Sequence, residues 1–379
     1  MTDPDRDPLP NTPYDSINFE QTRVLDTWRR YADRLTWGRG QCLAILDDGC
    51  DMSAPQWQVE MPWGRKVIAS YNSIDDNADP TPVPPGYHGT SVGYPSSLNH
   101  EGVLGVAYNN FVAQIRAVSI VHLSGQGEAD TMATGLRWVL EHHHEYNITA
   151  VNLSPLDDEP HQGPLPTLID GPLRALKEQG IWVSAPCGNN GYTNGISWPA
   201  CQSDCFSIGA TIPGEHAAHL DRFTNTDLLV AAAATSSSNA YAAACSMILR
   251  EAIDVGAYPW HDHGPTMADA MLSIFQQTGV SIEDSLVPSS FHELDLLAAV
   301  DHVLRQPRCL VWFCFSCEFR KNVGQVDAAG RLLGVVDFPD VPLEWQRIRP
   351  HTVSLGGPGS KTVFVSCGKD VFSLQISGG

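Results

Sequence analysis

The hydrophobic positions of this chain alternate between the spacing of amphipathic helices and short continuous runs. Apolar residues recur at helical spacing over 19–35, and Gly38 and Gly40 end that segment. A continuous apolar run over 42–46 follows and stops at Asp47. Such a run is typical of a strand that is buried on both faces of a sheet.

The same alternation continues after a Pro- and Asp-rich loop at 75–85. It predicts strands over 113–121, 150–153 and 181–185, with helices over 129–144 and 166–178. This order predicts an α/β fold, a parallel sheet with helices on both faces. Sites in such sheets gather at the carboxyl ends of strands, where Asp47 lies and which Asn189 closely follows.

The last part of the chain has a different texture. Residues 267–304 have helical spacing, with a connecting segment around 287–291. From residue 309, short Val-, Phe- and Trp-rich runs are separated by Gly and Pro turns, which predicts strands over 310–319, 332–338, 352–355, 362–366 and 371–376. We therefore expect an N-terminal arm over 1–18, an α/β domain over 19–305 and a small β-rich module over 306–379.

Composition narrows the class of protein. A hydrophobic content of 42% and a charged content of 17% indicate a folded soluble protein, and the formal charge of −20 argues against nucleic acid and anionic membranes as partners. No apolar run is long enough to span a bilayer, and the first residues lack the features of a signal peptide. We expect a cytoplasmic protein if this is the native start; a secreted mature form without its leader is the alternative.

Cysteine and histidine clusters raise the question of metal binding. Ten cysteines in 379 residues are not a disulfide scaffold, and buried thiols are the favoured interpretation. The histidine run at 142–144 fits a solvated helix end, because adjacent helical positions do not face one another. Four cysteines could bind zinc, although their spacing matches no strong finger pattern: Cys309, Cys314, Cys317 and Cys367.

A serine-rich segment leads into an Ala-rich run with good helix propensity, residues 239–248. A serine at the start of a helix lies where free backbone N–H groups favour negative charge, although a capping serine needs the same location. Asp47, His88 and Ser236 also follow one of the chain orders known for nucleophilic triads. Each residue alone has an ordinary interpretation, as a turn, a core histidine and a helix cap.

Together these segments resemble the subtilases, the subtilisin-like serine proteases, over about residues 20–305. The Asp-Asp-Gly sequence at 47–49 is similar to the kexin-like branch, and His-Gly-Thr at 88–90 resembles the histidine motif of the family. The segment around Asn189 resembles the oxyanion asparagine segment. Two further segments resemble the facing substrate-binding strands: Leu123, Ser124 and Gly125 in one, and Ser154, Pro155 and Leu156 in the other.

The resemblance implies a serine endopeptidase that acts on proteins or peptides through an acyl-enzyme. Ser236 would be the nucleophile, His88 the general base and Asp47 the residue that orients the imidazole. The Asn189 side chain and the Ser236 backbone N–H would stabilise the oxyanion. Acidic residues at 157–159 could attract basic side chains of a substrate.

The chain also departs from the family pattern. Ala234, Ser238 and Ala240 replace the usual Gly, Ala and Pro of the serine motif, and Ser237 is the second choice for the nucleophile. The Cβ of Ala234 could strain the turn, so a catalytically impaired, peptide-binding subtilase fold is an alternative. No cofactor is expected to be required; calcium is an open alternative, because Gln56 stands where many members have a ligand aspartate.

The β-rich module at 306–379 could instead be the working part, with the α/β domain as its scaffold. Partner docking, oligomerisation and stabilisation are its open roles.

Overall fold

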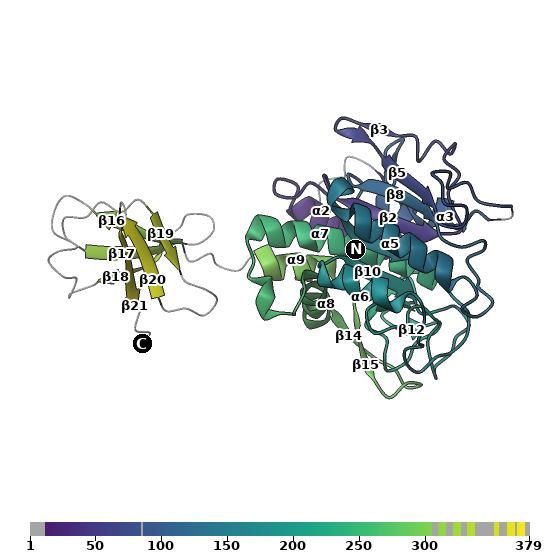
Figure 1. The fold of residues 1–379 in the computed structure, drawn as a ribbon. Helices are drawn as coiled ribbons and strands as arrows, with labels where there is room; N and C mark the ends of the chain where they lie inside the picture. Colours follow the sequence, from purple (N-terminus) through teal and green to yellow (C-terminus); the bar gives the residue numbers. More distant parts are fainter. Residues whose placement is uncertain are drawn as a thin grey trace. The chain divides into compact units, whose positions relative to one another are not determined.

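The computed structural model describes residues 12–84 and 86–304, and the backbone of six strands between 310 and 375. The chain divides into two compact units, Met1–Leu304 and Arg305–Gly379 (Figure 1).

Ten strands of the described part of the first unit form one sheet. Its order is β14-β15-β13-β11-β10-β9-β2-β8-β5, with β12 paired to β11. Pairing is parallel from β15 to β5 and antiparallel at β14 and β12. The bounds are β2 (Cys42–Asp47), β5 (Val67–Asn72), β8 (Phe111–Arg116), β9 (Ile148–Leu153), β10 (Trp182–Pro186), β11 (Phe206–Thr211), β12 (Ala218–His219), β13 (Leu228–Ala231), β14 (Val280–Glu283) and β15 (Ser290–Glu293).

Helices cover both faces of this sheet. They are α1 (Ser16–Gln21), α2 (Val24–Arg30), α3 (His88–Val92), α4 (Tyr94–Ser97), α5 (Ala129–Tyr146), α6 (Asp170–Glu178), α7 (Thr235–Gly256), α8 (Met267–Thr278) and α9 (Leu296–Leu304), with a 3-10 turn at Trp260–Asp262. Short pairs complete the unit: β1 (Thr12–Pro13) and β6 (Asn99–His100) flank β7 (Val103–Leu104), and β3 (Glu60–Met61) pairs with β4 (Gly64–Arg65).

Strand β2, an inner strand of the sheet, shows why a continuous apolar run is required. Leu43 and Ile45 pack in one core with α7 and α9, whereas Ala44 and Leu46 pack in a second core with α5 and α6. Successive side chains of a strand point to opposite faces, so a strand between two helix layers must be apolar at every position. The expected α/β architecture with helices on both faces is confirmed.

Two helical predictions were wrong in detail. The helix expected over 19–35 is two helices, because Arg23 adopts a left-handed conformation (φ 58°) between α1 and α2. The stretch 267–304, predicted as helical around a connecting segment, contains the antiparallel hairpin β14–β15 between α8 and α9. The apolar side chains of that hairpin pack against Leu229 in a small separate cluster.

The second unit contains two three-stranded antiparallel sheets. They comprise β16 (Leu310–Phe315), β17 (Lys321–Val326) and β18 (Leu332–Asp337), and β19 (Thr352–Leu355), β20 (Thr362–Cys367) and β21 (Asp370–Gln375). The polar strand β17 was not predicted. Cys309 and Cys317 lie outside the described residues, and only the backbone of Cys314 and Cys367 is described, so the zinc hypothesis stays a prediction.

Candidate active site

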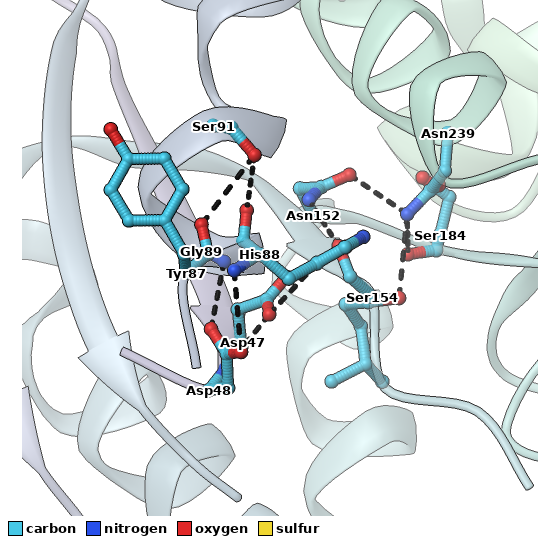
Figure 2. A network of polar contacts seen from close by, with 11 residues as sticks. Asp47, Asp48, Tyr87, His88, Gly89, Ser91, Asn152, Ser154, Ser184 and Asn239 are labelled. Carbon is cyan, nitrogen blue, oxygen red and sulfur yellow. Dashed lines mark hydrogen bonds and ion pairs between the residues drawn. The ribbon is translucent and has the colours of Figure 1, made fainter. Parts of the chain in front are cut away.

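A carboxylate and an imidazole meet at the carboxyl end of β2. Asp47 is the last residue of that strand, and His88 is the first residue of α3. The Nδ1 atom of His88 lies 3.0 Å from Asp47 Oδ1 and 2.9 Å from Oδ2 (Figure 2). Asp47 is only 1% exposed. This pairing fixes the His88 tautomer with Nδ1 protonated and leaves Nε2 as the basic nitrogen.

The charge state of His88 reflects two opposing effects. Burial favours the neutral imidazole, but the charge of Asp47, its hydrogen bond and the charge of Asp48 outweigh burial and raise the pKa of His88 above its ordinary value of 6.5. A raised pKa matches a base that must hold a proton during part of a catalytic cycle.

The first turn of α3 packs directly on the segment that follows β2. A Cβ at Gly89 would lie 2.3 Å from the carbonyl oxygen of Gly49 and 2.7 Å from Asp47 Cβ, so only glycine fits there. The Asp48 carboxylate accepts hydrogen bonds from two backbone N–H groups, 2.8 Å from Gly89 and 3.3 Å from His88. The helix that carries the imidazole is therefore held at the end of the strand that carries Asp47.

Ser236 lies in the first turn of α7, the helix that contacts α3. Its neighbour Thr235 donates two hydrogen bonds to Asn189 Oδ1, from the backbone N–H (2.9 Å) and from the hydroxyl (3.0 Å). The carbonyl end of the Asn189 amide is thereby occupied. Its NH₂ group donates to no partner among the described residues.

The three consecutive serines differ in what their hydroxyls do. Ser238 is fully buried and donates to the carbonyl oxygen of Val230 (2.9 Å), so its hydroxyl is committed to the helix packing. Ser236 is 8% exposed. Within the described part of the chain, neither its hydroxyl nor His88 Nε2 forms a hydrogen bond, so both atoms are available for substrate.

The substitution of Ala234 for the usual glycine is tolerated by the backbone. Ala234 is the N-cap of α7, with φ −143° and ψ 145°. This extended conformation suits any residue, so the expected turn strain is absent at this position.

The two segments expected to bind substrate are paired with each other. The Leu123 N–H donates to the Leu156 carbonyl oxygen (2.8 Å), and the Leu156 N–H donates to the Val121 carbonyl oxygen (3.0 Å). Ser154 is fully buried and its hydroxyl accepts a hydrogen bond from Asn152 (2.7 Å). The remaining members of the set, Ser124, Gly125 and Pro155, lie beside these residues in the chain.

A pocket of about 430 Å³ opens beside the imidazole. Its walls include Asp48, Tyr87, His88, Ile120, Val121 and His122. Asp48 is the one carboxylate among the residues that line it.

The acidic run at 157–159 is largely matched by groups of this chain. Asp157 is buried and accepts hydrogen bonds from His161 Nε2 (2.7 Å) and from the Trp198 backbone N–H (3.0 Å). Asp158 pairs with His122 Nδ1 at 2.7 Å. These carboxylates are less available to a basic substrate than their sequence indicated, although basic preference stays an untested prediction.

Asn239 was missed in the sequence, although a lone amide in an Ala-rich helix was a signal. Its Nδ2 donates to Asn152 Oδ1 (2.8 Å) and to the carbonyl oxygens of Ser184 (3.1 Å) and Leu153 (3.3 Å) (Figure 2). These bonds connect α7 to the ends of β9 and β10. The helix that carries Ser236 is thus fixed against the sheet edge that carries Asn189.

Metal and membrane features are limited in the described ranges. No group of three or more His, Cys, Asp or Glu side chains is arranged there to hold a metal ion. No helix in the same residues has the length and apolar character needed to cross a bilayer.

In the run 142–144, His142 and His143 use Nδ1 to bond the carbonyl oxygens of Trp138 and Leu140, respectively.

The sequence is similar to those of curated proteases. The chain is 28% identical to the intracellular serine protease of Paenibacillus polymyxa over 204 residues, 52% of this chain and 57% of the relative. It is 29% identical to the alkaline protease of Alkalihalobacillus alcalophilus over 188 residues, which are 49% of this chain and 43% of the relative. It is 28% identical to subtilisin Savinase of Lederbergia lenta over 188 residues, which are 49% of this chain and 61% of the relative. The chain therefore spans about half the length of the curated relatives it matches. Residues 38–267 match the subtilase family, peptidase S8, and because this is more than half of the chain, the protein belongs to that family.

Proposed function

We propose that this protein is a serine endopeptidase that hydrolyses peptide bonds of proteins or peptides through an acyl-enzyme. The observation that carries the proposal is the pairing of buried Asp47 with half-buried His88, whose Nε2 has no partner among the described residues, on a helix that contacts the helix of Ser236. The family assignment and relatives that are named as proteases support it.

In the first half-reaction, the Ser236 oxygen attacks the peptide carbonyl carbon while His88 Nε2 accepts the hydroxyl proton. Asp47 stabilises the imidazolium that forms and keeps Nδ1–H directed at its own oxygens. The C–N bond then breaks, and His88 returns the proton to the leaving amine. Because Nε2 and the hydroxyl are not bonded in the free protein, substrate binding has to bring them within hydrogen-bond reach.

The negative oxygen of the tetrahedral intermediate would be stabilised by two donors, the Asn189 NH₂ group and the Ser236 backbone N–H. The two bonds from Thr235 hold the amide in the required orientation before the reaction begins. In the second half-reaction, water attacks the ester carbon with His88 again as the base, which restores the Ser236 hydroxyl.

A fluorophosphonate probe tests the nucleophile directly, because it reacts only with an activated serine. We expect labelling of the full chain to disappear in Ser236→Ala and to persist in the matched control Ser237→Ala. Loss of labelling in Ser237→Ala with labelling retained in Ser236→Ala would move the nucleophile to the second serine. No labelling of the folded native chain would instead favour the peptide-binding alternative.

Peptide-library cleavage then establishes the reaction and its requirements. We propose that no metal is required for the chemical steps, because side chains supply the nucleophile, the base and the oxyanion donors. Cleavage that persists with chelator supports this; loss of cleavage, restored by calcium, would contradict it. We further propose a cytoplasmic location, since one relative is named an intracellular protease, and cell fractionation tests it.

A further inference from the structure

Asp48 carries a buried carboxylate that the proposed reaction does not use, although it lies next to the proposed base. We propose that Asp48 is a positioning residue: it holds the start of α3, and with it the His88 imidazole, against Asp47. Its charge adds a second, smaller effect on the pH range in which His88 acts as a base. The kinetic part of this inference rests on the proposed function, whereas the titration of His88 does not.

The consecutive carboxylates of Asp47 and Asp48 contact different parts of His88, its ring and its backbone. Asp47 binds the ring of His88, and Asp48 binds its backbone N–H (3.3 Å) and that of Gly89 (2.8 Å) (Figure 2). The two acids are also joined, because the Asp48 N–H donates to Asp47 Oδ1 (2.7 Å). The imidazole and the peptide group from which it projects are therefore both fixed to the end of β2.

Asp48 supplies what α3 lacks by itself. The helix has five residues, and its N-cap Tyr87 makes no side-chain capping bond. The first N–H groups of a helix have no partner within the helix, so an outside acceptor is needed when they are buried. The Asp48 carboxylate, 3% exposed, is that acceptor.

Glycines allow the chain to close around this carboxylate. A Cβ at Gly86 would lie 3.1 Å from Asp48 Oδ2 and 2.9 Å from the Val83 carbonyl oxygen. On the other side of His88, Gly89 has no room for a Cβ against Gly49 and Asp47. These two glycines thus let the segment that carries the base pack closely on the two carboxylates.

Charge gives Asp48 a second effect. After burial, which opposes it, Asp47 is the main cause of the raised pKa of His88, and Asp48 adds to it. Burial, followed by the charge of Asp47, raises the pKa of Asp48 itself, while the two N–H bonds and His88 oppose that rise. Other titratable groups around this segment are Cys50, Asp51, Tyr87, Tyr94 and His122, and His122 is paired with Asp158.

The variant Asp48→Asn separates the two effects. An asparagine can still accept the Gly89 hydrogen bond, but it carries no charge. We expect NMR titration of the His88 ring in the full chain, assigned by the signal lost in His88→Gln, to give a lower pKa in Asp48→Asn than in the native protein. The acid limb of kcat/KM should move to lower pH in the same variant.

Asp51→Asn is the matched control, because it removes the same charge three residues away. Its carboxylate bonds only to the backbone N–H and hydroxyl of Ser53 among the described residues. We expect no displacement of the His88 titration in this control. An equal displacement in both variants would mean that Asp48 acts only through net charge.

Asp48→Ala tests the positioning effect, since it removes the acceptor. We expect kcat at the plateau of the pH profile to fall by about tenfold or more, with KM changed less, because a base displaced by a fraction of an ångström loses its alignment. Asp48→Asn should lose less kcat than Asp48→Ala.

Two results would overturn the inference: an unchanged His88 titration in Asp48→Asn, or a native plateau kcat in folded Asp48→Ala. If Asp48→Ala does not fold, the comparison of Asp48→Asn with Asp51→Asn still decides the effect of the charge. If the native chain has no hydrolytic activity, the proposed function fails, and the NMR titration still tests Asp48.

Discussion

Thr235 offers the sharpest test of how this site is built. Its side chain is fully buried, and its hydroxyl donates to Asn189 Oδ1 (3.0 Å). The hydroxyl oxygen of Thr235 in turn accepts from the Gly188 N–H (3.2 Å). The substitution Thr235→Val removes the hydroxyl and keeps the branched shape. It also keeps the backbone N–H bond to Asn189 Oδ1 (2.9 Å).

The expected loss of kcat in Thr235→Val follows from the contacts of Asn189 that remain. Loss of a whole oxyanion donor costs about 2.7–4 kcal/mol in subtilisin, a member of this family. Thr235→Val leaves the Asn189 donor in place and removes one of its two anchors, so we expect a smaller loss, about tenfold in kcat or about 1.4 kcal/mol. The Gly188 N–H loses its acceptor in a buried place, which should lower the free energy of unfolding by about 1–3 kcal/mol.

The assay is steady-state hydrolysis of one peptide, together with urea unfolding of the same preparations. Thr235→Ser is the control, because it keeps the hydroxyl and loses only the methyl group; we expect it to retain more kcat and more stability than Thr235→Val. Native kcat in Thr235→Val would refute the idea that this hydroxyl orients Asn189. Equal losses in the two variants would attribute the effect to packing.

Three further predictions address other parts of the structure. Gly188→Ala should lower the free energy of unfolding by about 2 kcal/mol or more, because the new Cβ would lie 2.2 Å from Asp221 Oδ2 and the backbone has a φ of +115°. Gly163→Ala is the control: it has open space around it and should change the free energy of unfolding by less than about 0.5 kcal/mol. Equal changes in the two variants would contradict the clash. The raised pKa of His88 should place the acid limb of fluorophosphonate labelling above pH 6.5, and a midpoint below that value would contradict it. The same shift stabilises the fold at pH values below the unfolded pKa of His88, so the stability difference between the native chain and His88→Gln should shrink as pH rises through the folded pKa. Lys66→Ala should lower the free energy of unfolding by about 3 kcal/mol or more, because three acceptors within 2.9 Å of the Nζ of this buried side chain lose their donor: two oxygens of buried Asn110 and the carbonyl oxygen of half-buried Tyr108. The exposed Arg65→Ala is the control, and equal unfolding midpoints would refute this.

The sequence could predict those elements whose residue pattern follows directly from how each element is buried. A strand between two helix layers needs apolar residues on both faces, so β2 and its end at Asp47 were visible as a continuous run. The hairpin β14–β15 was missed because helical spacing on both sides hid it. The alternation of Val280 and Ile282 with polar residues was its signal.

The pair of Asp47 and His88 could be predicted from the sequence, but the hydrogen bonds around the candidate site could not. Asp47 and His88 were named from motifs, and the structure brings them into contact. The two bonds from Thr235 to Asn189 depend on how α7 meets the loop after β10, and no local pattern encodes that packing. Asp48 was likewise only part of a motif until the backbone of α3 was placed against it.

The direct pairing of Leu156 with Val121 and Leu123 changes the energetics of peptide binding. A peptide that adds as a strand beside Leu156 has to displace two intramolecular hydrogen bonds before it can form its own. Each main-chain hydrogen bond that such a peptide makes to Leu156 replaces one that Leu156 already makes within the protein. The main chain of the peptide would therefore contribute little net affinity at this point. Under the proposed function, side chains of the peptide would then supply most of the affinity, and we expect discrimination among peptides by their side chains more than by their extended backbone.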